Sequence, residues 1–352
     1  MLSQVKLKNF RNYPQAEVKT NSDLVLILGE NASGKTNFLE CIYFLSRLKS
    51  FRSPDNLLVR GQEDYFNLSG QYDEKNLDII IQIKPALRRL FKINEQKTKR
   101  LFWQAFPVVL FVPNDLNLFH LGPILRRRFL DETIAQIDSS YNLDLVSLEH
   151  ILKQKSALLE QIFQGQADAG QLELWNQELA PVAFRITQKR QTLVNFINQK
   201  LSTKVNELTG FANNCNLQYK RIFAQSEAEL LASLQEHQAA EIRSGQNLIG
   251  PHRDDFTVQK DGELNIYICS RGELRSQVLA LKLLQAEYLT NDKQKPIILL
   301  DDVFSELDET RRTKLIENLA GHQIFITSTE EHHLPKFSQN TLVLKVEDNE
   351  IK

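Results

Sequence analysis

The stretch LVLILGENASGKT, residues 24–36, decides the fold, because an apolar run typical of a buried strand there meets a glycine-rich loop. The loop fits the pattern G-x-x-x-x-G-K-[ST], with Gly29, Gly34, Lys35 and Thr36 at the fixed positions. Such a turn points backbone N–H groups at phosphate oxygens, and the following helix adds the positive end of its dipole. We therefore expect a nucleotide site made of Gly29, Glu30, Asn31, Ala32, Ser33, Gly34, Lys35, Thr36 and Asn37.

Two residues of this loop have distinct expected roles. The Lys35 ammonium would reach the β- and γ-phosphates, and the Thr36 hydroxyl would bind Mg²⁺. The alternative is a glycine-containing turn with no ligand. The apolar run before the loop and the helical spacing of Phe38, Leu39 and Ile42 after it favour the nucleotide site.

Composition bounds the class of protein. A chain of 352 residues is long enough for about two domains. Its 43 basic and 44 acidic side chains nearly cancel, so a nucleic-acid partner would need a local basic surface. The three scattered cysteines suit a reducing cytosol, and we find no secretory signal or membrane-length apolar stretch. We expect a soluble, cytoplasmic protein that does not bind membranes.

The composition and the hydrophobic pattern of the sequence change along the chain. Residues 1–121 and 244–352 carry strand and helix patterns of a mixed α/β domain, whereas residues 122–243 are rich in leucine and glutamine with helical spacing. We therefore predict one α/β nucleotide domain, split by a helical insertion lobe at 122–243. The insertion has no sustained heptads, so it is not an extended coiled coil.

A second acidic motif follows a predicted strand at 297–300. The stretch PIILLDDVFSELD, residues 296–308, places Asp301 and Asp302 at the carboxyl end of that strand. In a phosphate-loop ATPase a Mg²⁺-binding aspartate belongs there, so Asp301 would hold the metal. Asp302 would orient or deprotonate the attacking water. The plainer interpretation is that both acids cap a turn.

The stretch ICSRGELRS, residues 268–276, opens a predicted amphipathic helix and allows two interpretations. Ser270 and Glu273 have the spacing of a capping box. Ser270 and the Gly272 backbone could also bind a γ-phosphate at the helix N-terminus. Both can hold, because capping and anion binding use the same end of a helix.

Together these motifs resemble the RecF family of bacterial recombinational-repair proteins. The resemblance rests on LKNFRNY (7–13), GENASGKTN (29–37), KSFR (49–52), LRRRFLD (125–131), GPHRDDF (250–256), SRGELR (270–275) and DDVFSELD (301–308). It implies an ABC-type ATPase head that binds ATP and Mg²⁺, and it adds Arg11 to the nucleotide-binding residues. It also implies an ATP-dependent homodimer in which Ser270 and Gly272 complete the site of the partner, in trans.

The sequence departs from the family pattern at two places. Glu273 stands where members of the family usually have glutamine, and it would put an extra carboxylate near a phosphate unless the capping box holds it away. The glutamine loop of ABC heads has no obvious counterpart, and Asn114 or Asp115 is the candidate for that place.

The resemblance also implies binding of double-stranded or gapped DNA. Local cations that could contact DNA phosphates are Arg47, Lys49, Arg52, Arg88, Arg89, Lys97, Lys99 and Arg100. A solvated charged face is the alternative for each of them. Some of Arg126, Arg127 and Arg128 could instead form structural ion pairs with Asp131 or Glu132. Arg253 could pair with Asp254 or Asp255, or His252 and Arg253 could hold the helical lobe to the nucleotide domain.

By resemblance, the function is slow, DNA-stimulated ATP hydrolysis that times the release of a DNA clamp. Partners of the RecO and RecR type would help to load RecA, in gap repair, replication restart and SOS induction. The alternatives are an ABC-type transporter subunit, a structural-maintenance ATPase and a phosphate-loop kinase. The long helical insertion disfavours the first, and the lack of a coiled coil disfavours the second.

Overall fold

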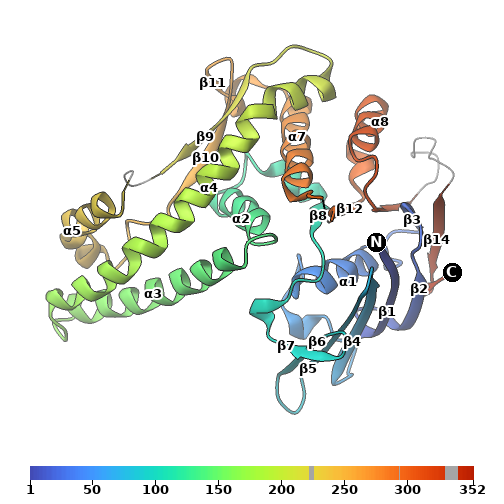
Figure 1. The fold of residues 1–352 in the computed structure, drawn as a ribbon, viewed down its shortest axis with the longest axis horizontal. Helices are drawn as coiled ribbons and strands as arrows, with labels where there is room; N and C mark the ends of the chain where they lie inside the picture. The colour runs from blue at the N-terminus through green and yellow to red at the C-terminus, as the bar shows by residue number, and fades with distance from the viewer. Residues whose placement is uncertain (222–225, 293, 330–339) are drawn as a thin grey trace. The chain divides into compact units, whose positions relative to one another are not determined.

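The computed structural model describes residues 1–221, 226–292, 294–329 and 340–352 (Figure 1). The chain divides into two compact units. The first unit contains Met1–Asn117, Glu207–Gly210 and Arg275–Lys352, and the second contains Leu118–Asn206 and Phe211–Leu274. Among the described residues, no helix is both long enough and apolar enough to cross a membrane.

A parallel sheet of the first unit carries the glycine-rich loop. Its strand order is β15-β14-β3-β13-β12-β8, and all neighbours are parallel except the terminal hairpin. The strands are β3 (Leu24–Leu28), β8 (Val108–Phe111), β12 (Ile297–Asp301), β13 (Ile324–Ser328), β14 (Thr341–Glu347) and β15 (Glu350–Ile351). Every residue of β3, β12 and β13 is buried, as expected of strands covered on both faces.

The second sheet of this unit is antiparallel, in the order β2-β1-β4-β5-β6-β7. Its strands are β1 (Leu2–Phe10), β2 (Tyr13–Lys19), β4 (Tyr65–Tyr72), β5 (Lys75–Gln82), β6 (Arg88–Ile93) and β7 (Gln96–Thr98). Burial alternates along them: Val5 and Leu7 of β1 are buried, whereas Lys6 and Lys8 are exposed. One face therefore packs on the core and the other faces solvent.

The helix α1 (Lys35–Arg47) contacts strands of both sheets. Its residues from Phe38 to Ser46 are all buried, and the hydrophobic core includes side chains from α1, the parallel strands and the antiparallel strands. A helix that is covered on every side belongs to the interior of its unit. The glycine-rich loop is therefore attached to a helix that is buried within the first unit.

Two more helices flank the acidic motif. Residues Arg271–Leu274 of the helix α7 (Arg271–Leu289) belong to the second unit and the rest to the first. Asp308 caps the N-terminus of α8 (Glu309–Asn318), because its carboxylate accepts a hydrogen bond from Arg311 N at 2.8 Å. Short 3₁₀ turns occur at Asp55–Leu57, Arg100–Phe102, Pro113–Asn117 and Val303–Glu306 of the first unit and at Ala169–Gln171 of the second. The helix α7 matches the amphipathic helix predicted to begin within residues 268–276.

The second unit combines helices with a small sheet. The helices are α2 (Pro123–Ile134), α3 (Ser139–Phe163), α4 (Leu172–Thr209), α5 (Glu227–Ser244) and α6 (Asn265–Ile268), and the last residues of α4 belong to the first unit. The sheet has the order β11-β10-β9, with β9 (Cys215–Lys220), β10 (Asp255–Lys260) and β11 (Glu263–Leu264). The helices match the texture expected of the insertion.

The compact units differ from the predicted split at 122–243. Residues 244–274, which we expected in the nucleotide domain, group with the second unit because β10 pairs with β9 along its whole length. The strand β9 was not expected, since it lies within the stretch predicted to be helical. Whether the predicted segments fold as separate domains stays a prediction.

Charged residues of the motifs LRRRFLD (125–131) and GPHRDDF (250–256) form ion pairs and hydrogen bonds within the second unit. Arg126 binds Asp255 at 2.7 and 3.0 Å, and Arg127 donates to the carbonyl oxygen of Asp254 at 2.7 Å. Arg128 pairs with Glu132 at 3.3 Å. All of these partners lie in the second unit, so the pairs hold its own elements together. The role of His252 and Arg253 in holding the helical lobe to the nucleotide domain stays a prediction.

The Arg190 guanidinium, only 2% exposed, is the buried centre of this network. It binds both carboxylate oxygens of Asp131 at 2.8 and 2.9 Å and the carbonyl oxygen of Pro251 at 2.7 Å. It also lies 3.4 Å from the fully buried carboxylate of Asp254, which accepts from the Tyr219 hydroxyl. One side chain thus joins α2, α4 and the segment that leads into β10.

We predict that Arg190→Met lowers the free energy of unfolding by about 3–5 kcal/mol, because two carboxylates lose the guanidinium that balances their buried charge. Arg128→Met is the matched control, since its pair with Glu132 is exposed and should contribute about 0.5 kcal/mol or less. Urea unfolding followed by circular dichroism measures both. Equal losses for the two variants would contradict a central role for Arg190.

Candidate nucleotide-binding site

The glycine-rich loop connects the end of β3 to the start of α1, and its two fixed glycines are sterically required. Gly34 has φ of 120°, and a Cβ there would lie 2.4 Å from Asn12 Nδ2. A Cβ on Gly29 would lie 2.5 Å from the carbonyl oxygen of Val346. Any side chain at either position would displace the loop, so the backbone path that aims N–H groups at phosphate depends on glycine.

The Lys35 side chain folds over the loop. Its ammonium donates to the carbonyl oxygens of Gly29 and Glu30 at 2.8 and 2.7 Å, and the residue is 8% exposed. Burial lowers the pKa of Lys35, while the nearby charges of Asp302 and Asp301 oppose that shift. The positive charge therefore lies within the loop and beside the acids, where phosphate oxygens can replace the two carbonyls.

One polar atom of the loop lacks a partner. Among the described residues, the hydroxyl of Ser33 is buried and makes no hydrogen bond. A buried hydroxyl without a partner is costly. A phosphate oxygen cradled by the loop would satisfy it, so the loop as built fits a phosphate ligand.

Thr36 and Asp301, the two residues expected to hold Mg²⁺, contact each other in the structure. The Thr36 hydroxyl at the start of α1 donates to Asp301 Oδ1 at 2.7 Å, and the Asp301 side chain is 7% exposed. A hydroxyl and a carboxylate are the oxygen ligands that Mg²⁺ prefers. The described residues contain no cluster of three or more His, Cys, Asp or Glu, so other ligands of a metal here would come from phosphate and water.

Thr327, at the end of β13, is a positioning residue that the sequence did not reveal. Its hydroxyl donates to Asp301 Oδ1 at 2.9 Å and accepts from the backbone N–H of Asp302 at 2.9 Å. Asp301 and Thr327 are register partners of the parallel sheet. Only the pairing of β12 with β13 could have identified it.

Asp302 has the properties expected of a base. Its backbone is left-handed, with φ of 51°, a conformation that non-glycine residues seldom adopt. Burial raises the pKa of its carboxyl, the neighbouring Asp301 raises it further, and Lys35 opposes the shift. A higher pKa makes a carboxylate a better proton acceptor, which suits the role of orienting and deprotonating water.

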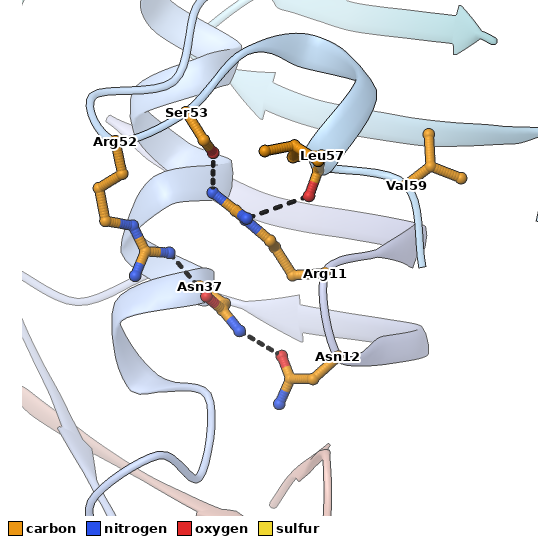
Figure 2. Close-up of a pocket in the computed structure, with 7 residues that line it drawn as sticks. All are labelled: Arg11, Asn12, Asn37, Arg52, Ser53, Leu57 and Val59. Carbon is orange, nitrogen blue, oxygen red and sulfur yellow. Dashed lines mark hydrogen bonds between the residues drawn. The ribbon is translucent and has the colours of Figure 1, made fainter. Parts of the chain in front are cut away.

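A pocket of about 510 Å³ opens beside the loop (Figure 2). Amides connect it to the phosphate site: Asn12 donates to the carbonyl oxygen of Ser33 at 3.0 Å, and Asn37 donates to Asn12 at 2.7 Å. The pocket is lined by Arg11, Asn12, Asn37, Arg52, Ser53, Leu57 and Val59. Its amides, guanidinium groups and apolar side chains can accept the sugar and base of a nucleotide.

The fully buried carboxylate of Glu40, on α1, organises this pocket. Arg11 binds it at 2.7 and 2.8 Å, and Arg52 binds it at 2.6 Å. Burial raises the pKa of Glu40, but the hydrogen bonds from Arg11, Arg52 and Ser50 outweigh burial and lower it overall. The guanidinium of Arg11 also donates hydrogen bonds to the Ser53 hydroxyl and to the carbonyl oxygen of Leu57, as Figure 2 shows. Arg11 therefore lines the pocket with a guanidinium that is already hydrogen-bonded within the chain.

The predicted capping box at residues 270–273 is present. Ser270 N donates to Glu273 Oε2 at 2.8 Å, and Glu273 N donates to Ser270 Oγ at 3.3 Å. Lys260 binds the other carboxylate oxygen of Glu273 at 2.5 Å. Ser270 and Gly272 belong to the second unit, so the first unit brings together only the glycine-rich loop, the acids and the pocket.

The candidates for the glutamine-loop position lie after β8. The Asp115 carboxylate accepts from Val112 N at 2.9 Å and pairs with Lys282 of α7 at 2.9 Å. Asn114 is exposed. Asp115 is thus engaged in holding its own turn to α7.

The expected DNA-binding cations lie at several places. Arg88 and Arg89 belong to β6, Lys97 belongs to β7, the edge strand of the antiparallel sheet, and Lys99 and Arg100 follow β7 in the sequence. Arg89 pairs with Asp55 at 2.9 Å. Arg47 ends α1 and Lys49 follows it, whereas Arg52 lines the pocket beside the glycine-rich loop.

Comparisons with known proteins place the chain among ATPases of DNA repair. Residues 1–117 match the family model described as AAA ATPase domain. The DNA replication and repair proteins RecF of Staphylococcus aureus strains JH9 and Newman are each 35% identical over 344 residues, covering 93% of this chain and 93% of theirs. A solved structure of the recombination mediator protein RecF-ATP in the RecFOR pathway is 28% identical, with a TM-score of 0.90, covering 100% of this chain and 96% of that one.

A more distant likeness supports the fold alone. The SmcHead bound to the C-winged helix domain of ScpA is 14% identical, with a TM-score of 0.55, and covers 100% of this chain and 96% of that one. Together with the closer match, it confirms the predicted fold, an ABC-type ATPase head of mixed α/β structure.

We predict that Thr327→Val lowers the rate of Mg²⁺-dependent ATP hydrolysis by about 10- to 100-fold, because Asp301 and Asp302 lose the hydroxyl that holds them. ATP binding should persist, since the loop and Lys35 are intact. Thr313→Val is the control, because the Thr313 hydroxyl only donates to the carbonyl oxygen of Glu309 on α8. Steady-state kinetics across a Mg²⁺ titration measure the effect, and an unchanged rate would contradict the role of Thr327.

Proposed function

The chain belongs to the RecF family of DNA replication and repair proteins, and on that premise we propose that it is an ATP-dependent DNA-binding protein of recombinational repair. The observation that carries the proposal is the Asp301 contact: the loop that binds phosphate and the strand that ends in two acids meet at 2.7 Å. The likeness to RecF over 93% of the chain connects this site to DNA repair rather than to transport. The alternative of a transporter subunit is therefore not favoured.

The reaction is the transfer of the γ-phosphoryl group of ATP to water. The loop N–H groups and Lys35 neutralise the phosphate charge, while Thr36 and Asp301 provide oxygens for Mg²⁺. When bound, Mg²⁺ would neutralise charge on the β- and γ-phosphates. Asp302 holds the attacking water and accepts its proton, as its raised pKa favours.

The site is completed in trans by a second copy of the chain. Ser270 and Gly272 form the N-terminus of a capped helix, which can bind the γ-phosphate of the partner's ATP. Because binding ATP creates a contact between two copies, nucleotide shifts the monomer–dimer equilibrium by mass action. Slow hydrolysis, stimulated by DNA, then reopens the dimer.

DNA is the proposed macromolecular ligand, in double-stranded or gapped form. The cations of β6, β7 and the residues that follow offer flexible contacts to phosphates, which need no base sequence. RecO- and RecR-type proteins are the proposed partners, in the cytoplasm, because the related RecF structures belong to the RecFOR pathway. The proposed outcome is RecA loading on gapped DNA.

We predict that DNA binding requires Mg-ATP and weakens steeply with salt. Lys97→Ala/Lys99→Ala should lower DNA affinity and reduce the slope of log affinity against log salt by up to about 2, since each lost phosphate contact removes about 0.9. Lys19→Ala is the control, because exposed Lys19 lies on β2, at the opposite edge of the same sheet. Fluorescence anisotropy with a gapped duplex measures the slopes.

Two results would contradict the proposal. Binding that is indifferent to ATP would separate the nucleotide site from DNA. Binding that Lys19→Ala reduces as much as the double variant would remove the β6–β7 edge from the DNA surface.

A further inference from the structure

Both carboxylate oxygens of Glu273 accept hydrogen bonds from within the same chain. Glu273 lies in the first turn of the helix whose N-terminus we propose to bind phosphate. One oxygen accepts from the backbone N–H of Ser270 at 2.8 Å, and the other binds the Lys260 ammonium at 2.5 Å. These two hydrogen bonds lower the pKa of Glu273 to about 2, although partial burial opposes the shift. Glu273 is therefore ionised at neutral pH, and its charge is balanced by Lys260.

An ionised carboxylate at this place opposes the proposed chemistry. A helix N-terminus binds a phosphate through its N–H groups and dipole, and a negative side chain in the first turn competes for both. Like charges in a site that is shielded from water repel strongly. The carboxylate can be tolerated there only if it points away and carries a counter-charge.

The backbone of Lys260 is fixed within a sheet, from which its ammonium can supply that counter-charge. Lys260 is the last residue of β10, and its backbone is paired with Cys215 of β9 on one side and with Glu263 of β11 on the other. The turn that follows has φ of 52° at Asp261 and 90° at Gly262, which returns the chain tightly to β11. The ammonium thus extends from the centre of a three-stranded sheet, not from a loose surface strand.

We propose that Lys260 is a positioning residue of the shared nucleotide site, which holds and neutralises Glu273 so that Ser270 and Gly272 can bind the partner's γ-phosphate. This inference rests on the proposed function. It adds a residue from β10 to a site otherwise formed by the glycine-rich loop, the acids and the start of α7. It also accounts for glutamate at position 273 without loss of the phosphate-binding helix start.

The test is the ATP-dependent dimerisation of four chains: the natural chain, Lys260→Met, Glu273→Gln and the double variant. Methionine keeps the apolar stem of Lys260 without its charge. Glutamine keeps the capping box, because its side-chain oxygen can still accept from Ser270 N, and removes the carboxylate charge. Light scattering in Mg-ATP gives the dimer dissociation constant, and a fluorescent nucleotide gives the ATP affinity of the monomer.

We expect Lys260→Met to raise the dimer dissociation constant at least 10-fold. The dissociation constant of the double variant should lie within about 3-fold of the value for Glu273→Gln, because removing the carboxylate charge removes the need for the lysine. Such a rescue would show that Lys260 acts through its charge and not through folding. Monomer ATP affinity should be equal in all four chains, since the glycine-rich loop is unchanged. Lys6→Met is the control, because it removes a Lys–Glu pair of the antiparallel sheet, 3.1 Å from Glu17. It should leave the dimer unaffected.

The outcomes separate this inference from the function on which it rests. A natural chain that dimerises with ATP, together with a Lys260→Met variant that does so equally well, overturns the inference alone. A double variant as weak as Lys260→Met also overturns it, since the lysine would then matter for structure and not for masking charge. A natural chain that never dimerises with ATP overturns both the shared site and the role of Lys260.

Discussion

The first unit depends on the hydrogen bonds that the carboxylate of Asp301 accepts. This carboxylate accepts hydrogen bonds from Thr36, at the start of α1, and from Thr327, at the end of β13, while Asp301 itself terminates β12. Three elements that are far apart in sequence therefore meet at one buried group. The parallel strand order makes this possible, because the carboxyl ends of β3, β12 and β13 lie at one edge of the sheet. That arrangement brings together the residues that we propose to carry out the nucleotide chemistry.

Elsewhere in the chain, buried charged side chains are neutralised by ion pairs. These pairs give a structural role to sequence motifs outside the glycine-rich loop and the Asp301–Asp302 pair. The Glu40 carboxylate binds the guanidinium groups of Arg11 and Arg52 beside the pocket next to the glycine-rich loop. In the second unit, Arg190 is matched by Asp131 and by the segment before β10. Such pairs stabilise modestly, but losing one partner is costly, so they fix which elements pack together. The strand β10 is held at its start by this network and supplies Lys260 at its end.

Local patterns in the sequence were enough to predict the loop, the capping box at 270–273 and the burial of β3 and β12, because each depends on neighbouring residues. The features that sequence did not reveal depend on pairing across long separations. Thr327 becomes important only through its register with Asp301, and β9 forms only because β10, some forty residues later, pairs with it. The lining of the pocket beside Arg11 likewise comes from three separate segments. Composition gave no sign of DNA, since the charges nearly cancel.

The central claim is that each nucleotide site is built from two copies of the chain, and mixing two inactive variants tests it most directly. Lys35→Ala should disable the loop, and Ser270→Arg should block the helix start that we propose to face the partner copy. A mixed dimer of the two contains one site with an intact loop and an intact helix, so ATP hydrolysis should return on mixing, to as much as a quarter of the natural rate if subunits pair at random and each site works alone. No recovery, in a mixture shown to form mixed dimers, would mean that Ser270 acts on the loop of its own chain or on none.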